Sequence, residues 1–199
     1  MKSESVDVKY LVTGATGWVG QTVLKELQNM LGHEKLASHV YAFASKRQFY
    51  TVQAGERSAT IEIHPLSAMI RIANENKNIR ILHSAFLTKD RIPEVGLDHY
   101  ISTNRLISRT IGAAIEGSAS ARVALISSGA AQEFDGCQDA SSSLQWNPYG
   151  FLKHQEELAI SEIAPTQIFR IYGLTGRFIR DPHKFALGDF LLKAKARLP

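Results

Sequence analysis

Three glycines stand three residues apart in the stretch "TGATGWVG", at Gly14, Gly17 and Gly20. The stretch follows the apolar run "VKYLV" and leads into "QTVLKELQNML", so it lies where a strand is expected to turn into a helix. The start of a helix offers unpaired backbone N–H groups and the positive end of the helix dipole, and a residue without a Cβ lets a phosphate come close. We therefore expect Gly14 to turn the chain, Gly17 to admit a pyrophosphate and Gly20 to let the helix pack on the strand.

The end of the second expected strand bears on the choice of dinucleotide. A carboxylate at this point accepts hydrogen bonds from the ribose of NAD, but none occurs between Glu34 and Glu56. Ser45, Lys46 and Arg47 stand there instead, and a hydroxyl and two cations suit a 2′-phosphate. The sequence therefore favours NADP(H), with NAD(H) as the second choice; the alternative is a solvated loop whose charges touch no ligand.

A second chemical group is expected on a later helix, in "NPYGFLKHQEE". Asn147 can cap this helix and Pro148 fits its first turn, which puts Tyr149 and Lys153 one turn apart on one face. An ammonium beside a phenol favours the phenolate, so Tyr149 could exchange a proton with a hydroxyl or carbonyl oxygen. Such pairs also occur on helix surfaces with no chemical role.

Two serines precede this helix, at the end of the strand-like segment "VALISSGAA". Ser127 and Ser128 lie where the carboxyl end of a parallel strand faces a bound ligand. Either hydroxyl could hold the reacting oxygen. The following residues, 129–147, lack periodicity and predict a loop.

The elements that must position these residues alternate between strand-like and helical patterns, which is typical of an α/β fold with a doubly wound parallel sheet, the Rossmann fold. We expect strands near residues 8–13, 39–44, 59–63, 79–84, 122–127 and 166–172. We expect helices near 18–31, 66–76, 95–116, from Pro148 onward, and near 183–197.

Composition narrows the class of protein. The chain has 199 residues, 44% of them hydrophobic and 21% charged, which suits one soluble domain. No apolar run approaches the roughly 20 residues that cross a bilayer, and the first residues lack a signal peptide, so we expect a cytoplasmic protein. The single cysteine, Cys137, has no partner for a disulfide or metal site. The net charge of +4 is dispersed, which disfavours nucleic-acid binding.

Taken together, these motifs resemble the extended short-chain dehydrogenase/reductase family of nucleotide-sugar epimerases, dehydratases and reductases. The glycine motif, "ILHSAF", "HYISTNRLISRTIGAA", "ISSGAA", "YGFLK" and "FRIYGLTG" occur in the family's order. The resemblance implies that Ser128 orients the substrate, Tyr149 is the acid/base, Lys153 stabilises its phenolate and holds the nicotinamide ribose, and Asn104 braces the site. The positions it implies for cofactor binding are Gly14, Thr16, Gly17, Trp18, Val19, Gly20, Ser45, Lys46, Arg47, Ser84, Ala85, Tyr149 and Lys153.

The chain also departs from the family. Gly129 and Ala130 stand where the dehydratases place an Asp and a Glu, which disfavours a dehydratase and leaves epimerisation or ketone reduction open. Relatives continue into a lobe that grips the nucleotide-sugar. Residues 1–175 are expected to form the dinucleotide-binding domain and 176–199 only the start of such a lobe, so we expect a piece of a longer protein.

The sequence thus predicts an NAD(P)-dependent oxidoreductase or epimerase that acts on a nucleotide-sugar by hydride transfer, with no metal ion and with pairing into a homodimer left open. The first alternative is a non-catalytic NADP(H)-binding module or redox sensor of the same fold. A structural or partner-binding domain is the second.

Overall fold

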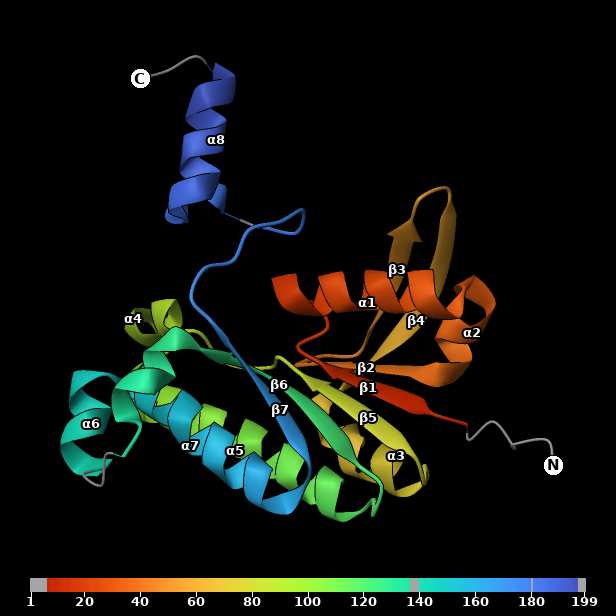
Figure 1. Cartoon of the computed structure of the whole chain (residues 1–199), viewed down its shortest axis with the longest axis horizontal. Helices are drawn as coiled ribbons and strands as arrows, with labels where there is room; N and C mark the ends of the chain where they lie inside the picture. Colours follow the sequence, from red (N-terminus) through yellow and green to blue (C-terminus); the bar gives the residue numbers. More distant parts are fainter. Residues whose placement is uncertain (1–6, 137–139, 180, 197–199) are drawn as a thin grey trace.

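The computed structural model describes residues 7–136, 140–179 and 181–196. Within these residues seven strands form one sheet in the order β3-β4-β2-β1-β5-β6-β7 (Figure 1). Their bounds are β1 (Lys9–Thr13), β2 (Val40–Ala44), β3 (Gln48–Ala54), β4 (Arg57–Pro65), β5 (Ile79–His83), β6 (Arg122–Ser128) and β7 (Thr166–Ile171). Every neighbouring pair is parallel except β3 and β4.

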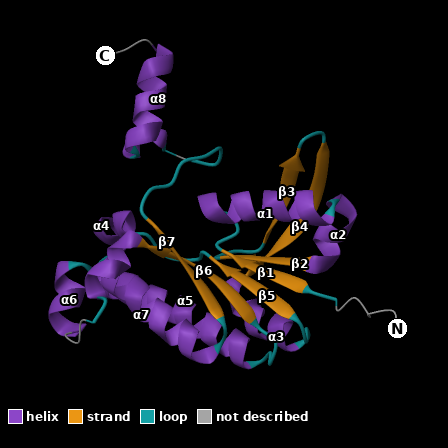
Figure 2. Ribbon diagram, in the orientation of Figure 1, coloured by secondary structure: helices purple, strands orange, loops and turns teal. Residues whose placement is uncertain are grey.

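Helices cover both faces of this sheet (Figure 2). One face carries α1 (Trp18–Leu31) and α2 (His33–His39), and the other carries α3 (Met69–Asn74), α5 (Leu97–Glu116) and α7 (Pro148–Ile163). The shorter helices are α4 (Ile92–Val95), α6 (Ala140–Trp146) and α8 (Ala186–Ala196), with 3₁₀ turns η1 (Leu66–Ala68), η2 (Lys89–Arg91), η3 (Gly129–Phe134) and η4 (Pro182–Lys184). The predicted doubly wound α/β fold is confirmed.

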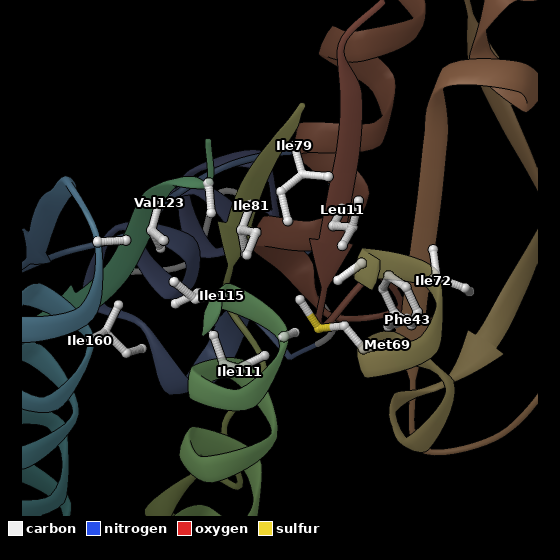
Figure 3. Close-up of a cluster of buried hydrophobic side chains, with 14 of the residues drawn as sticks. Leu11, Phe43, Met69, Ile72, Ile79, Ile81, Ile111, Ile115, Val123 and Ile160 are labelled. Carbon is white, nitrogen blue, oxygen red and sulfur yellow. The ribbon is translucent and has the colours of Figure 1, made fainter. Parts of the chain in front are cut away.

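Two hydrophobic clusters hold the helices on the sheet. Side chains alternate between the faces of a strand, so Leu11 enters the cluster under α3, α5 and α7, while its neighbour Val12 enters the cluster under α1 and α2. The first cluster is drawn in Figure 3, where Leu11, Phe43 and Ile81 lie against Met69 and Ile111. Because both faces are covered, the central strands are apolar on both sides.

The antiparallel hairpin of β3 and β4 was not predicted. No element was predicted for the residues of β3, although "QFYTVQA" is rich in aromatic and β-branched residues. A two-residue turn containing Gly55 at φ +64° closes the pair between Ala54 and Arg57. The hairpin extends the sheet beyond β2 with an antiparallel edge.

Three further segments differ from expectation. The loop predicted over 129–147 contains η3 and α6, and α2 is a helix that periodicity did not indicate. The helix predicted over 95–116 begins at Leu97, because Gly96, at φ +82°, separates it from α4.

Among the described helices, none has both the length and the apolar character that a bilayer crossing requires.

The order of the strands creates a switch point between β1 and β5. The chain leaves β1 through α1 toward β2 on one side, and returns from β4 through α3 to β5 on the other side. Ligands of open α/β sheets bind at the carboxyl ends of the two strands flanking such a point. Gly14 directly follows β1 and Ser84 directly follows β5.

Candidate functional site

The glycine turn is closely packed at two of its three positions. Gly14 has φ +67°, and a Cβ on it would lie 2.8 Å from backbone atoms of Ser84 and Ala85. A Cβ on Gly20 would lie 2.2 Å from the carbonyl oxygen of Gly14. These positions have the geometry expected of a tight turn and of a helix packed against the end of a strand.

Gly17 is less crowded than the other two glycines. A Cβ on it would meet only the Gly14 carbonyl oxygen, at 3.1 Å. It is the N-cap of α1 and makes no side-chain cap hydrogen bond, so no side chain covers the first backbone N–H groups of the helix. Such an uncapped start of a 14-residue helix is suited to a phosphate group.

Two adjoining cavities open at this turn, and both are lined by Gly14, Gly17, Ser84 and Phe86. The first, of about 370 Å³, lies over the ends of β2 and β5. Its other lining residues are Thr16, Phe43, Ala44, Ser45, Leu66, Ala85, Leu87, Thr103 and Ile107. It is mainly apolar, which suits a planar base.

The second cavity, of about 440 Å³, lies between the start of α1 and the start of α7. Tyr149 and Lys153 line it from one side, while Trp18 and Val19 line it from the other. Phe185 closes part of it through an edge-to-face contact with Trp18, with ring centroids 5.2 Å apart. The remaining lining residues are Thr88, Ile126, Ser127, Ile171, Tyr172, Gly173 and Leu174.

Tyr149 and Lys153 pack against the same aromatic ring. The ring of Tyr149 meets Phe86 edge to face, with centroids 5.6 Å apart. The Nζ atom of Lys153 lies 4.1 Å from the centroid of the Phe86 ring and donates to the backbone oxygen of Ile126 at 3.0 Å. The structure therefore brings the predicted pair together, into one cavity with the glycine turn.

The start of α7 has the predicted cap. Asn147 Oδ1 accepts a hydrogen bond from the backbone N–H of Gly150 at 3.1 Å, and Pro148 occupies the first turn. A Cβ on Gly150 would lie 2.5 Å from the carbonyl oxygen of Ala130, so the helix start packs tightly on η3. The cap and this contact set the direction in which Tyr149 enters the cavity.

The two serines at the end of β6 have different surroundings. Ser127 lines the second cavity, is only 4% exposed, and its Oγ atom has no hydrogen-bond partner among the described residues. Ser128 is not among the lining residues, and its Oγ atom accepts a hydrogen bond from the backbone N–H of Ala130 at 3.2 Å. Of the two alternatives, Ser127 is the one that has a free hydroxyl beside Tyr149.

The loop that follows β5 is braced from two sides. Asn104 Oδ1 accepts from the backbone N–H of Leu87 at 2.8 Å, and its Nδ2 donates to the Leu87 carbonyl at 3.1 Å. On the other side, Ser84 Oγ donates to the carbonyl oxygen of Thr13 at 2.8 Å. Asn104 is thus a backbone brace for the loop that carries Ser84, Ala85 and Phe86.

The residues predicted to read a 2′-phosphate are only partly gathered. Ser45 lines the first cavity, whereas Lys46 and Arg47 are exposed and do not line it. Arg47 Nε forms an ion pair with Glu62 Oε1 of β4 at 2.6 Å. Glu62 belongs to the strand predicted near residues 59–63, but its approach to the end of β2 was not predicted.

A buried charged group beside Lys153 was also missed. Glu156 Oε2 accepts from Lys153 Nζ at 2.9 Å, and Glu156 Oε1 lies 3.0 Å from His83 Nε2. Burial alone would raise the pKa of Glu156, but the charge of Lys153 and the contacts with His83 lower it to about 2. The signal in the sequence was two adjacent glutamates on a helix that lacks a clear polar face.

A second cluster of charged residues lies next to this site. Arg170 Nη2 contacts Asp135 Oδ1 at 2.6 Å and Glu157 Oε2 at 2.7 Å, with His154 Nδ1 3.5 Å from Asp135. The hydrogen bond from Arg170 lowers the pKa of Asp135, although desolvation acts in the opposite direction. The Arg170 guanidinium contacts both carboxylates, so the cluster is an ion-pair network.

Comparison with known proteins finds similar structures but no relative recognisable from its sequence. The chain matches no protein-family model and no curated protein. Among solved structures it superimposes on the enzyme WbmG of Bordetella bronchiseptica in complex with NAD, with a TM-score of 0.64 and 17% identity over 100% of this chain and 63% of that one. The chain shares its fold with this NAD-bound enzyme.

Two further matches agree with this. A UDP-glucose 4-epimerase of Thermotoga maritima with UDP-glucose gives a TM-score of 0.65 at 16% identity, covering 93% of this chain and 62% of that one. A UDP-glucuronic acid 4-epimerase of Bacillus cereus in complex with UDP-glucuronic acid and NAD gives a TM-score of 0.62 at 16% identity, covering 96% of this chain and 64% of that one. The resemblance expected from the motifs is confirmed for the fold, and the chain spans less than two thirds of the length of each of these proteins.

Proposed function

We propose that the two cavities together bind a nicotinamide dinucleotide and that the protein transfers hydride to or from a nucleotide-sugar, with Tyr149 as the acid/base. The observation that carries the proposal is that the uncapped glycine turn and the Tyr149–Lys153 pair line one continuous cleft at the switch point of the sheet. The solved structures of the same fold contain NAD and UDP-sugars, which supports the proposed ligand classes.

The lining residues fit the parts of a dinucleotide in order. The apolar cavity over Phe43 and Leu66 suits the adenine and its ribose, and Ser45 offers a hydroxyl at its edge. The start of α1 at Gly17 suits the diphosphate, because its first N–H groups are uncovered. The cavity between Trp18 and Lys153 is left for the nicotinamide half.

A bound nicotinamide dinucleotide would supply the hydride donor or acceptor. The residues of the chain would hold the reacting groups and move the proton. Tyr149 would exchange a proton with the substrate oxygen, and Lys153 would place a positive charge beside it and hold the ribose. Holding the reactants in one geometry would supply much of the rate enhancement.

We assign the substrate-orienting hydroxyl to Ser127, in place of the Ser128 that the family resemblance indicated. A buried hydroxyl without a partner is costly unless a ligand completes its hydrogen bonds, and Ser127 is the one of the two in the cavity. Ser128 keeps the turn into η3 by accepting from Ala130. Replacement of Ser127 by Ala should therefore impair turnover more than replacement of Ser128.

Epimerisation or ketone reduction suits the site better than dehydration. Gly129 supplies no carboxylate, and a Cβ at its position would overlap the ring of Tyr172. Tyr172 would have to move before an acidic residue could act at this point. The preference for NADP(H) over NAD(H) rests on Ser45, Lys46 and Arg47. Because Arg47 forms an ion pair with Glu62, a bound 2′-phosphate would have to share the Arg47 guanidinium with this carboxylate.

The first test is an equilibrium titration with NADPH and with NADH, followed through the fluorescence of Trp18 and of the reduced nicotinamide. We expect saturable binding of both, with NADPH the tighter ligand. Absence of binding would contradict the proposal and leave a structural or partner-binding role.

The second test replaces Tyr149 by Phe and measures turnover with UDP-, GDP- and dTDP-sugars. We expect binding of the dinucleotide to persist while turnover falls at least 100-fold, since general acid–base catalysis contributes about that much. Tyr50→Phe is the matched control, because its hydroxyl contacts Gln21 away from the cleft. Saturable dinucleotide binding without turnover in the wild-type chain would favour the non-catalytic module.

A further inference from the structure

Lys153 is held by a buried carboxylate that the proposed reaction does not itself require. Its side chain is 5% exposed, that of Glu156 is 0% exposed, and their atoms Nζ and Oε2 lie 2.9 Å apart on neighbouring turns of α7. The Nζ atom also donates to the carbonyl oxygen of Ile126 in β6. An ammonium has three N–H donors, so these two contacts leave one for a ligand in the cavity.

Glu156 is fixed in turn by groups from two other elements. Ser108 Oγ of α5 donates to Glu156 Oε1 at 2.9 Å, and His83 Nε2 of β5 lies 3.0 Å from the same oxygen. The carboxylate therefore has hydrogen bonds at both oxygens and contacts from β5, α5 and α7. Arg105 and Arg109 of α5 line a groove between α5 and α7 that Glu156 also lines.

The orientation of His83 follows from the residues on its far side. Thr13 Oγ1 accepts from the backbone N–H groups of Ser84 at 3.2 Å and Ala85 at 3.3 Å, which uses both of its lone pairs. Its own proton is then available for His83 Nδ1, 2.6 Å away. The proton of the ring is thereby assigned to Nε2, from which it is donated to Glu156.

The hydrogen bonds thus run from the end of β1, through His83 and Glu156, to the ammonium of Lys153. The same Thr13 side chain holds the start of the loop that carries Ser84 and Ala85, both of which line the first cavity. The chain of contacts ties the position of the Lys153 ammonium to the backbone of the predicted cofactor site.

We propose that Glu156 is a positioning residue, which holds the Lys153 ammonium at the point where it meets the ribose of a bound dinucleotide. This inference rests on the proposed function, since it needs a dinucleotide in the cleft. A buried cation without its counterion would seek other partners or lose its charge, and the remaining N–H donor would no longer be fixed. Glu156 itself lines neither of the two cavities.

A double-mutant cycle on NADPH binding tests this role. We expect Glu156→Gln to weaken binding about tenfold, and Lys153→Met to weaken it at least as much. If Glu156 acts through Lys153, the double variant should bind no more weakly than Lys153→Met alone. A merely structural role would give the same loss in both backgrounds.

Glu157→Gln is the matched control. Glu157 is the adjacent glutamate of α7 and is also buried, but its partner is Arg170 and it does not line the cavity. We expect it to lower the melting temperature without changing the dissociation constant for NADPH. If Glu156→Gln does not fold, the double variant of Glu156→Gln and Lys153→Met should fold, because it removes both charges. Ser108→Ala should then weaken NADPH binding about threefold in the wild-type background and not in the Lys153→Met background.

The outcomes separate the inference from the proposed function. Wild-type affinity in folded Glu156→Gln, or equal losses in the presence and absence of Lys153, would overturn the positioning role while leaving the dinucleotide site intact. No NADPH binding by the wild-type chain would overturn both.

Discussion

At the scale of single residues, the three glycines separate structure from binding. Gly20 faces the Gly14 carbonyl oxygen so closely that a methyl group cannot fit, while a Cβ on Gly17 would meet the same oxygen at 3.1 Å. We expect Gly20→Ala to destabilise the fold by about 2 kcal/mol or more, because the helix must shift from the strand. Chemical denaturation of the variant measures this loss.

Gly17→Ala is the counterpart of that variant. Gly17 lines both cavities, and its methyl group would be less crowded than one on Gly20, so we expect a smaller loss of stability than in Gly20→Ala and at least a tenfold loss of NADPH affinity. Urea denaturation and fluorescence titration of the same sample measure both quantities. Unchanged affinity in Gly17→Ala would argue against a diphosphate at the turn.

Glu156 gives the protein a defined response to acid. Its pKa of about 2 in the folded protein lies below the ordinary value of 4.5, so its ionised form stabilises the fold above pH 4.5 and this contribution is lost as the pH falls toward 2. The groups facing it are Lys153, His83 and Ser108, with Arg105 and Arg109 along the adjoining groove.

We therefore expect Glu156→Gln to lower the free energy of unfolding by about 3 kcal/mol at pH 7, since it leaves Lys153 without a counterion. The difference from wild type should shrink between pH 4.5 and pH 2. Denaturation curves at several pH values measure it, and a difference that stays constant down to pH 2.5 would contradict the lowered pKa.

At the scale of elements, the cap of α7 can be tested separately from its chemistry. Asn147 accepts from Gly150 N–H and also donates to Glu133 Oε2 at 2.9 Å. We expect Asn147→Ala to cost about 1 kcal/mol, and Asn147→Asp, which keeps the accepting oxygen, to cost less. Thermal denaturation compares the two variants. Equal losses would show that the contact with Glu133, and not the cap, is what matters.

The strands and the long helices were predictable because their patterns are local. Val12 and Leu11 alternate, Tyr149 and Lys153 lie one turn apart, and Asn147 precedes Pro148 at a cap, so sequence spacing alone placed these residues. The hairpin of β3 and β4 was missed, since only the strand near residues 59–63 was predicted and no element was assigned to the segment after "SKR".

The contacts between elements were not predictable in the same way. His83 and Glu156 are 73 residues apart in sequence, and nothing in their local patterns indicates that β5, α5 and α7 meet around one carboxylate. The same holds for Ser127 and Ser128, because the path of β6 decides which hydroxyl enters the cavity. Sequence spacing identified the chemical groups, and the fold determined which of them face the cleft.

At the scale of the whole molecule, the site is shared by both halves of the sheet. The glycine turn and Ser45 come from the β1–β2 side, and Tyr149 and Lys153 from the β6–β7 side, so a dinucleotide would connect them (Figure 1). A ligand present at 100 times its dissociation constant adds about 2.7 kcal/mol to the stability of the folded state. We expect NADPH at this concentration to raise the melting temperature by about 5 to 10 °C.

Differential scanning fluorimetry measures this shift, with ATP at the same concentration as the control for binding at the adenine cavity alone. ATP lacks the nicotinamide half of a dinucleotide, so it should produce a smaller shift. An equal shift with both ligands would indicate that the cavity near Tyr149 takes no part in binding.

The most direct measurement is a crystal structure of the chain with NADPH or NADH. We expect the diphosphate to lie at the backbone N–H groups that follow Gly17. We expect the nicotinamide ribose to lie within hydrogen-bond distance of Lys153 Nζ. Density for the dinucleotide away from the start of α1, or with the nicotinamide outside the cavity of Tyr149 and Lys153, would contradict these expectations.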